Sequence, residues 1–221
     1  MESKTISNPF KPGAGHQPPY LAGRSAEQEE MSELLQQREI TQNLTLTGLR
    51  GVGKTVLLDA FKPIALKMGW LWATNDMSEA ASETDDNLAV RILTDIAIVT
   101  SPLVVEETRQ IPLGFAQAER VLHRPLNFEV LRARYEQAPG LVSDKLKACL
   151  EFVWAMLPQG AISGIVFAYD EAQNLADHEE EKQFPLALLL DVFQSRLPAT
   201  APERPVTPPE SGGWSKYASC R

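Results

Sequence analysis

The sequence predicts an α/β protein in which a mostly parallel sheet is flanked by helices. Two short apolar stretches, residues 70–74 and 162–169, each follow a segment with helical spacing and read as strands. The second is almost continuously apolar, which is typical of a strand buried on both faces of a parallel sheet. A glycine-rich loop between a predicted strand and a predicted helix is the third observation. At 221 residues, the chain is long enough for one sizeable core.

The composition is that of an ordinary globular protein, with 43% hydrophobic and 23% charged residues. A net charge of −8 gives no overall basic surface for nucleic acid, although a local patch stays open. The two cysteines, Cys149 and Cys220, indicate neither a disulfide framework nor a zinc site. The polar N-terminus lacks the apolar core of a signal peptide, and no apolar run approaches a bilayer span. We therefore expect a cytoplasmic protein.

Residues 1–24 form a leader rich in proline and glycine, which excludes a regular helix or a central strand. A flexible leader is one interpretation, but Phe10, Tyr20 and Leu21 are of little use to a purely solvated segment. The next stretch, from Ser25 to Leu35, predicts a helix with Ser25 as its N-cap. Its acidic residues indicate a solvated helix face rather than a metal site.

The next segment has the strongest functional pattern. Leu44–Thr47 predicts a short buried strand, and Thr55–Met68 predicts a helix that Pro63 kinks or ends. Between them the chain fits G-x-x-x-x-G-K-[ST], the phosphate-binding loop, at every fixed position. The matching residues are Gly48, Leu49, Arg50, Gly51, Val52, Gly53, Lys54 and Thr55.

The order strand, loop and helix is what phosphate binding requires. Glycines let backbone N–H groups close around the phosphates, and the helix N-terminus adds a partial positive charge. We expect Lys54 to reach the β- and γ-phosphates and the Thr55 hydroxyl to bind Mg²⁺. A chance glycine-rich turn is the alternative, and we interpret the chain as a nucleotide binder.

Beyond this loop, residues 70–74 predict the second strand of a βαβ unit, in which Trp70 and Trp72 are core residues rather than a stacking platform. Residues 87–99 predict a helix. Prolines interrupt residues 101–140, and we assign them no function beyond a family-specific insertion. We expect a surface or packing role for the isolated His123.

A second chemical motif follows the helix predicted at residues 141–157, where we expect Cys149 to be inert packing. The apolar strand 162–169 runs directly into Asp170 and Glu171, which is the Walker B arrangement of P-loop NTPases. Asp170 is expected to hold the Mg²⁺ carried by Thr55, and Glu171 to take the proton of the attacking water or orient it. Two solvated acids at a strand end are the alternative. The long separation from Lys54 must hold more than one crossover.

With both motifs in view, the chain resembles AAA-type P-loop ATPases of the Orc1-like group, specifically bacterial ATP-binding proteins. The likeness spans roughly residues 8–195, with 101–140 poorly matched, and includes the leader, TGLRGVGKT at 47–55 and DEAQNL at 170–175. In such ATPases the segment before the first helix lies against the adenine. The resemblance therefore implies that backbone and apolar atoms of this segment line the base, at Tyr20, Leu21, Gly23 and Arg24.

The C-terminal part departs from that pattern. Residues 184–197 predict a helix, but the proline-rich stretch that follows cannot form a strand or bury a core. The sensor strand and arginine-bearing lid that the resemblance implies have no place in this sequence. We expect a chain cut short after Walker B, or a last stretch read in the wrong frame; a genuine disordered tail is the alternative. The expected organisation is a leader (1–24), an incomplete ATPase core (25–196) and a tail (197–221).

The expected function is binding of ATP with Mg²⁺ and hydrolysis of the β–γ bond as a conformational switch. Turnover should be weak, because no arginine for the transition-state charge can be identified and Arg50 is a doubtful substitute. Two alternatives stay open: a non-hydrolysing nucleotide-binding module that controls a partner, and a DNA-associated Orc1-like initiator or mobile-element ATPase, which rests on fold analogy. The expected partners are ATP or ADP and a protein or a second copy, and no membrane.

Overall fold

The computed structural model describes residues 23–37, 40, 42–81, 83–113, 116–158 and 160–194. The predicted leader and tail lie almost entirely outside these ranges. The described elements follow one another along the chain as α1 (Ser25–Gln36), α2 (Lys54–Lys67), β1 (Trp70–Asp76), the 3₁₀ turn η1 (Glu79–Ala81), α3 (Asp85–Thr100), β2 (Val104–Leu113), β3 (Ala116–Pro125), α4 (Phe128–Gln137), α5 (Val142–Met156), β4 (Gly164–Asp170), the 3₁₀ turns η2 (Ala172–Asn174) and η3 (Glu179–Glu181), and α6 (Pro185–Gln194).

Two parallel strands, β1 and β4, form the centre of the molecule. They pair in register from Trp70 opposite Gly164 to Asp76 opposite Asp170. Parallel strands require a crossover connection, and here α3, the β2–β3 hairpin, α4 and α5 all lie between them in the chain. The predicted strands at both positions are confirmed. Within the described residues the parallel sheet consists of this pair, so the structure mixes helices and strands in a way compatible with the predicted α/β class.

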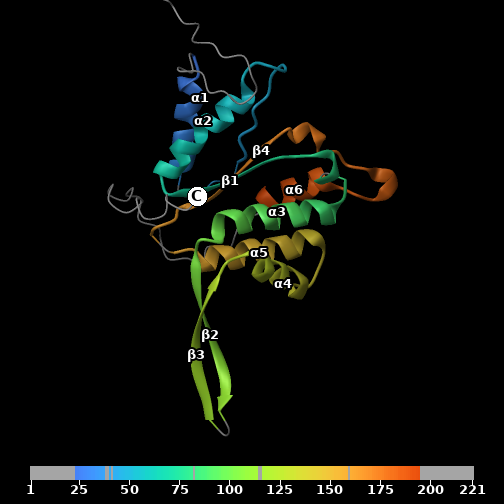
Figure 1. Cartoon of the computed structure of the whole chain (residues 1–221). Helices are drawn as coiled ribbons and strands as arrows, with labels where there is room; N and C mark the ends of the chain where they lie inside the picture. The colour runs from blue at the N-terminus through green and yellow to red at the C-terminus, as the bar shows by residue number, and fades with distance from the viewer. Residues whose placement is uncertain are drawn as a thin grey trace, which may run out of the picture.

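Helices cover both faces of the pair, as Figure 1 shows. Successive side chains of a strand point to opposite faces, so the two strands divide their apolar residues between two clusters. Ile165 and Phe167 of β4 pack with α3, α5 and α6, whereas Val166 and Ala168 pack with α1 and α2. Trp72 is buried in the second cluster, which confirms its prediction as a core residue.

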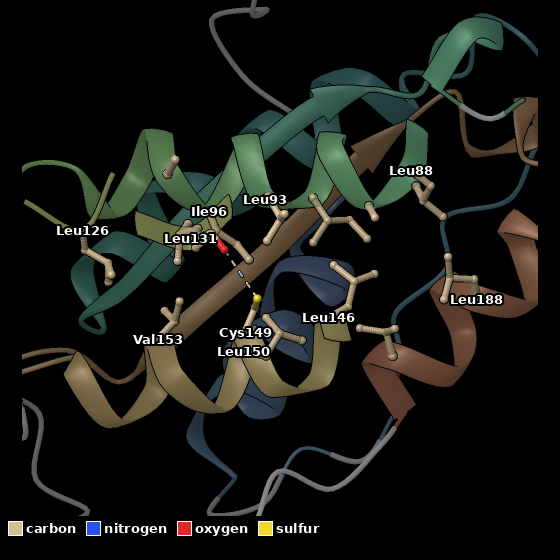
Figure 2. Packing of buried hydrophobic residues seen from close by; sticks show 14 of the residues in the cluster. Leu88, Leu93, Ile96, Leu126, Leu131, Leu146, Cys149, Leu150, Val153 and Leu188 are labelled. Atoms are coloured by element: carbon tan, nitrogen blue, oxygen red, sulfur yellow. Dashed lines mark hydrogen bonds between the residues drawn. The ribbon is translucent and has the colours of Figure 1, made fainter. Parts of the chain in front are cut away.

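The larger cluster lies between α3 and α5. Figure 2 shows Leu93 and Ile96 of α3 facing Cys149 and Leu150 of α5. Cys149 is fully buried, and its thiol donates a hydrogen bond to the Leu131 carbonyl at 3.7 Å. The predicted packing role of this cysteine is confirmed.

The predicted helices appear as α1, α2, α3, α5 and α6, but one local prediction, the N-cap of the first helix, is wrong. Ser25 is the first helical residue of α1 and not its cap, which is Arg24, without a side-chain capping bond. Of the two effects predicted for Pro63, a kink or the end of the helix, the second is excluded, because Pro63 lies inside α2 and the helix continues to Lys67. A proline removes only one intrahelical N–H, and Leu57, Phe61 and Ala65 keep the helix packed on the core.

The predicted strand at Leu44–Thr47 is also wrong, because residues 42–49 have no regular secondary structure. The segment retains the alternation of a strand: Leu44 and Leu46 are half-buried against the second cluster, whereas Thr45 and Thr47 are exposed. Alternation reflects one-sided burial, but a strand also needs ladder hydrogen bonds from a neighbour.

The chain between α3 and α4 forms an antiparallel hairpin that extends away from the helices (Figure 1). Its strands, β2 and β3, pair from Val104 opposite Pro125 to Leu113 opposite Ala116. At its base, the Leu126 N–H donates to the Leu103 carbonyl at 3.2 Å, and the buried Thr100 hydroxyl donates to the Leu126 carbonyl at 2.8 Å. The sequence offered no structure for this region.

Candidate functional site

The glycine-rich loop leads into α2 beside the carboxyl end of β4. Gly51 has φ +83° and Gly53 has φ +87°, and both values lie in the left-handed region. A side chain at either position would be strained, so the backbone requires the glycines that the motif supplies. Gly53 stands at the cap position of α2, directly before Lys54. The predicted order of loop and helix is therefore present, without the preceding strand.

The side chains of the loop leave its backbone accessible. Leu49, Arg50 and Val52 are all exposed. The Lys54 ammonium crosses the loop and donates to the Gly48 carbonyl at 3.0 Å and to the Leu49 carbonyl at 3.1 Å. The loop therefore presents two cations, Arg50 and Lys54, and its own peptide groups, which are the recognition elements for an anion such as phosphate.

The two predicted motifs meet in space, although Thr55 and Asp170 lie 115 positions apart in the chain. The Thr55 hydroxyl donates to Asp170 Oδ2 at 2.5 Å. The other carboxylate oxygen, Oδ1, accepts the Glu171 N–H at 2.8 Å, and the Asp170 carbonyl accepts the Met77 N–H at 3.0 Å. The pairing of β1 with β4 thus fixes the aspartate beside the start of α2.

Glu171 follows at once and has an uncommon backbone conformation. Its φ is +53°, in the left-handed region that side chains other than glycine seldom adopt. The exposed carboxylate accepts a hydrogen bond from the Gln173 amide. The Asn174 amide donates to the Met77 carbonyl at 2.6 Å, so the turn after β4 is attached to the end of β1.

Asp76 is a further acidic residue of this edge that the sequence analysis missed. It ends β1 and is the direct neighbour of Asp170 in the parallel register. Strand alternation places it on the sheet face that β4 turns toward α1 and α2. The signal was present, because the acid lies two residues beyond the predicted strand 70–74, but only the register shows that the two strands end together.

A buried carboxylate lies on the opposite face of the sheet. Asp95 of α3 is 1% exposed, and its Oδ1 accepts the Asn75 amide at 2.9 Å. Burial raises the pKa of the Asp95 carboxyl above its ordinary value, while the Asn75 hydrogen bond and the Arg91 guanidinium at 3.8 Å act against that rise. The hydrogen bond from Asn75 to Asp95 connects α3 to the end of β1, directly before Asp76.

The predicted base-side residues are only partly described, since Tyr20 and Leu21 lie outside the described residues. Gly23 has φ +76° and precedes Arg24, whose guanidinium donates to Glu27 Oε1 at 2.5 Å and to the Val52 carbonyl at 3.1 Å. The hydrogen bond from Arg24 lowers the pKa of the Glu27 carboxyl. Beside this pair is a hollow of about 270 Å³, lined among others by Arg24, Glu27, Thr45, Thr47, Val52 and Lys54.

The donor set fits a magnesium ion only in part. Thr55 and Asp170 offer a hydroxyl and a carboxylate, the hard oxygen ligands that Mg²⁺ prefers, and this ion usually takes few protein ligands beside water and phosphate oxygens. Across the described ranges, no group of three or more His, Cys, Asp or Glu side chains is arranged to hold a metal ion by itself. The phosphate ligand would therefore have to complete the coordination.

The carboxyl edge of the β1–β4 pair thus brings together the glycine-rich loop with Lys54, the hydrogen-bonded pair of Thr55 and Asp170, and the neighbouring acid Asp76. No helix in the described part of the chain is long and apolar enough to cross a bilayer. Comparison of the chain with protein-family models, with curated proteins and with solved structures gave no match.

Proposed function

We propose that the chain is a P-loop ATPase domain that binds ATP with Mg²⁺ and hydrolyses its β–γ bond. The observation that carries the proposal is the 2.5 Å hydrogen bond between Thr55 Oγ1 and Asp170 Oδ2. Two motifs that matched by chance would not be expected to contact each other across the fold, so their contact supports a common site. The contact is the one expected between the loop hydroxyl and the strand aspartate of a magnesium nucleotide site.

Binding would use groups already at the loop. Lys54 would exchange its bonds to the Gly48 and Leu49 carbonyls for phosphate oxygens, and the loop N–H groups would hold the remaining phosphate charge. Thr55 and Asp170 would hold Mg²⁺, which when bound neutralises part of the phosphate charge. The hollow lined by Arg24, Val52 and Lys54 offers space beside the loop for the rest of the nucleotide.

Hydrolysis requires a proton acceptor, and Glu171 is the candidate. Its carboxylate would take the proton from a water whose oxygen bonds to the γ-phosphorus, while the bond from that phosphorus to the β–γ bridging oxygen breaks and ADP leaves. Glu171 would first have to release the Gln173 amide. Turnover should be slow, because Arg50 is exposed at the loop surface, while the hydrogen bonds of Arg24 hold its guanidinium on Glu27 and on the Val52 carbonyl.

That glutamate–glutamine contact also favours a second candidate, a nucleotide-binding module that does not hydrolyse. With the Glu171 carboxylate engaged by Gln173, the site would grip ATP without activating water. The substitution Glu171→Gln separates the two functions: an ATPase loses phosphate release and keeps its affinity, whereas a binding module shows the same background release before and after.

The family proposal is that of the AAA-type ATPases of the Orc1-like group, with nucleotide state used as a switch. Its support is the order of motifs along the chain, the parallel pairing of β1 with the β4 strand that ends in Asp170, and the position of Arg24 beside the loop.

The deciding experiment is thermal unfolding with and without ATP and Mg²⁺. A ligand at about 100 times its dissociation constant that binds only the folded chain adds about 2.7 kcal/mol of stability. We expect a rise of the midpoint for the wild type and none for Lys54→Ala. Lys67→Ala, in the last turn of the same helix, is the matched control and should shift like the wild type. A cooperative transition in the wild type that ATP leaves unmoved would refute the site.

A further inference from the structure

Arg24 connects the first helix to the phosphate-binding loop. One guanidinium nitrogen, Nη1, donates to Glu27 Oε1 at 2.5 Å, and the other, Nη2, donates to the Val52 carbonyl at 3.1 Å. Both side chains of the ion pair are about one third exposed, with relative exposures of 35% and 31%. The guanidinium is a planar fork with fixed donor directions, so holding one donor on Glu27 also directs the other.

The bond to Val52 fixes a peptide plane and not only a carbonyl. The described residues contain no cis peptide bond, so the Val52 C=O and the Gly53 N–H point in opposite directions from one rigid unit. With the carbonyl held toward Arg24, the Gly53 N–H is directed to the other side of the loop. A cation on the carbonyl also polarises the peptide and makes that N–H a stronger donor.

Glycine at this position makes an external constraint useful. Gly53 has φ +87° and, like Gly51 at +83°, can also adopt other backbone conformations at little cost. The loop alone therefore does not lock the orientation of the Val52–Gly53 peptide. Arg24, at the N-terminal cap of α1, fixes this orientation from outside the loop. The helix α1 is held in place by Met31, Leu34 and Leu35, which are buried in the cluster shared with α2.

We propose that Arg24 is a positioning residue of the phosphate-binding loop, which holds the Val52–Gly53 peptide so that the Gly53 N–H faces the bound phosphate. The identity of the ligand rests on the function proposed above. This role differs from the base-lining role that the resemblance implies for Arg24, because it acts on the phosphate end of the ligand. The other charged residues that line the hollow are Glu27, Glu30 and Lys54, and Glu27 is the ion-pair partner of Arg24.

The test compares ATP with inorganic tripolyphosphate, each with Mg²⁺, by titration calorimetry on the full chain. Arg24→Ala should weaken both probes by the same factor, about three- to tenfold, which corresponds to the net contribution of one ordinary hydrogen bond. Arg24→Lys, which cannot reach both acceptors with fixed geometry, should resemble Arg24→Ala. The control is Arg132→Ala, which breaks an exposed 2.7 Å pair with Glu136 on α4 and should change neither affinity.

Hydrogen exchange of the nucleotide-free chain gives the readout that does not depend on binding. Arg24→Ala should accelerate exchange in the peptide covering residues 48–55 and leave α2 beyond it, and the thermal midpoint, unchanged. A loss confined to ATP, with tripolyphosphate and loop exchange as in the wild type, would show that Arg24 serves the base and would overturn the proposal. If the wild type binds neither probe, the proposed function fails, and unaltered loop exchange in Arg24→Ala would still reject the positioning role separately.

Discussion

The buried thiol of Cys149 makes a pH-dependent prediction. Burial in the cluster between α3 and α5 raises its pKa from 9.0 to about 11. Between these values the thiol ionises in the unfolded chain and stays neutral in the folded one, so ionisation stabilises the unfolded state and stability falls as pH rises. Between pH 9 and pH 11, we expect the free energy of unfolding of the wild type to fall by about 2 kcal/mol or less relative to that of Cys149→Ala.

Denaturant unfolding of both proteins across that pH range measures the difference directly. Cys149→Ala starts less stable, because the small side chain leaves space beside Leu131 and Leu150. The difference in the free energy of unfolding between the two proteins should decrease as the pH rises. A gap that stays constant to pH 11 would mean that the thiol ionises equally in both states.

At this scale the sequence identified Lys54, Thr55 and Asp170 as candidates, because their spacing within motifs reflects direct chemical requirements. The structure places Lys54 across the loop and Thr55 in contact with Asp170, and their roles stay predictions. The sequence did not predict what depends on backbone conformation or on neighbours distant in sequence. The left-handed Glu171, the position of Asp76 beside Asp170 and the bond from Arg24 to Val52 all arise from tertiary geometry.

Thr84 provides a test at the level of an element, since it caps α3. Its hydroxyl oxygen accepts the Asn87 N–H at 3.1 Å, and Asp85 and Asp86 follow in the first turn. Thr84→Ala should lower the free energy of unfolding by about 1 kcal/mol, whereas Thr84→Ser keeps the hydroxyl and most of the stability. Urea unfolding of the three proteins gives the comparison. Equal losses for alanine and serine would show that the methyl group, and not the cap, matters.

Most helices could be predicted because each carries an apolar stripe that a core requires, as Leu88, Ile92 and Ile96 do in α3. The hairpin could not, because Pro112 and Pro125 argue against strands. In a two-stranded ribbon, however, both strands are edges, where a proline without an N–H is tolerated. The strand predicted at Leu44–Thr47 is wrong for the opposite reason. The alternation of half-buried and exposed residues is present, but the segment has no regular secondary structure and so lacks the backbone hydrogen bonds of a strand.

For the whole molecule, the hairpin is expected to be dispensable for folding. Its strands pair with each other and extend away from the two clusters (Figure 1). Because Glu106 lies opposite His123, replacing residues 107–122 with an Asn-Gly turn should leave a short hairpin with a favoured two-residue loop. We expect a cooperative transition with a midpoint close to that of the full chain, and the same response to ATP and Mg²⁺.

Differential scanning calorimetry of the shortened chain, with the full chain beside it, checks this expectation. Retained folding with a lost ATP response would mean that the hairpin supports the site rather than the core. A loss of cooperative unfolding would place the hairpin within the folding unit and contradict its apparent separation from the two clusters.

The separation of 115 positions from Thr55 to Asp170 also sets the order in which the two residues are synthesised. A ribosome adds about 5–20 residues per second, so Asp170 follows Thr55 by roughly 6 to 23 s. During that interval the nascent chain already contains the glycine-rich loop and Thr55, but Asp170, whose carboxylate contacts Thr55 in the folded protein, has not yet been synthesised. Under the proposed function, nucleotide binding with Mg²⁺ would therefore begin only after Asp170 has been made and β4 has joined β1.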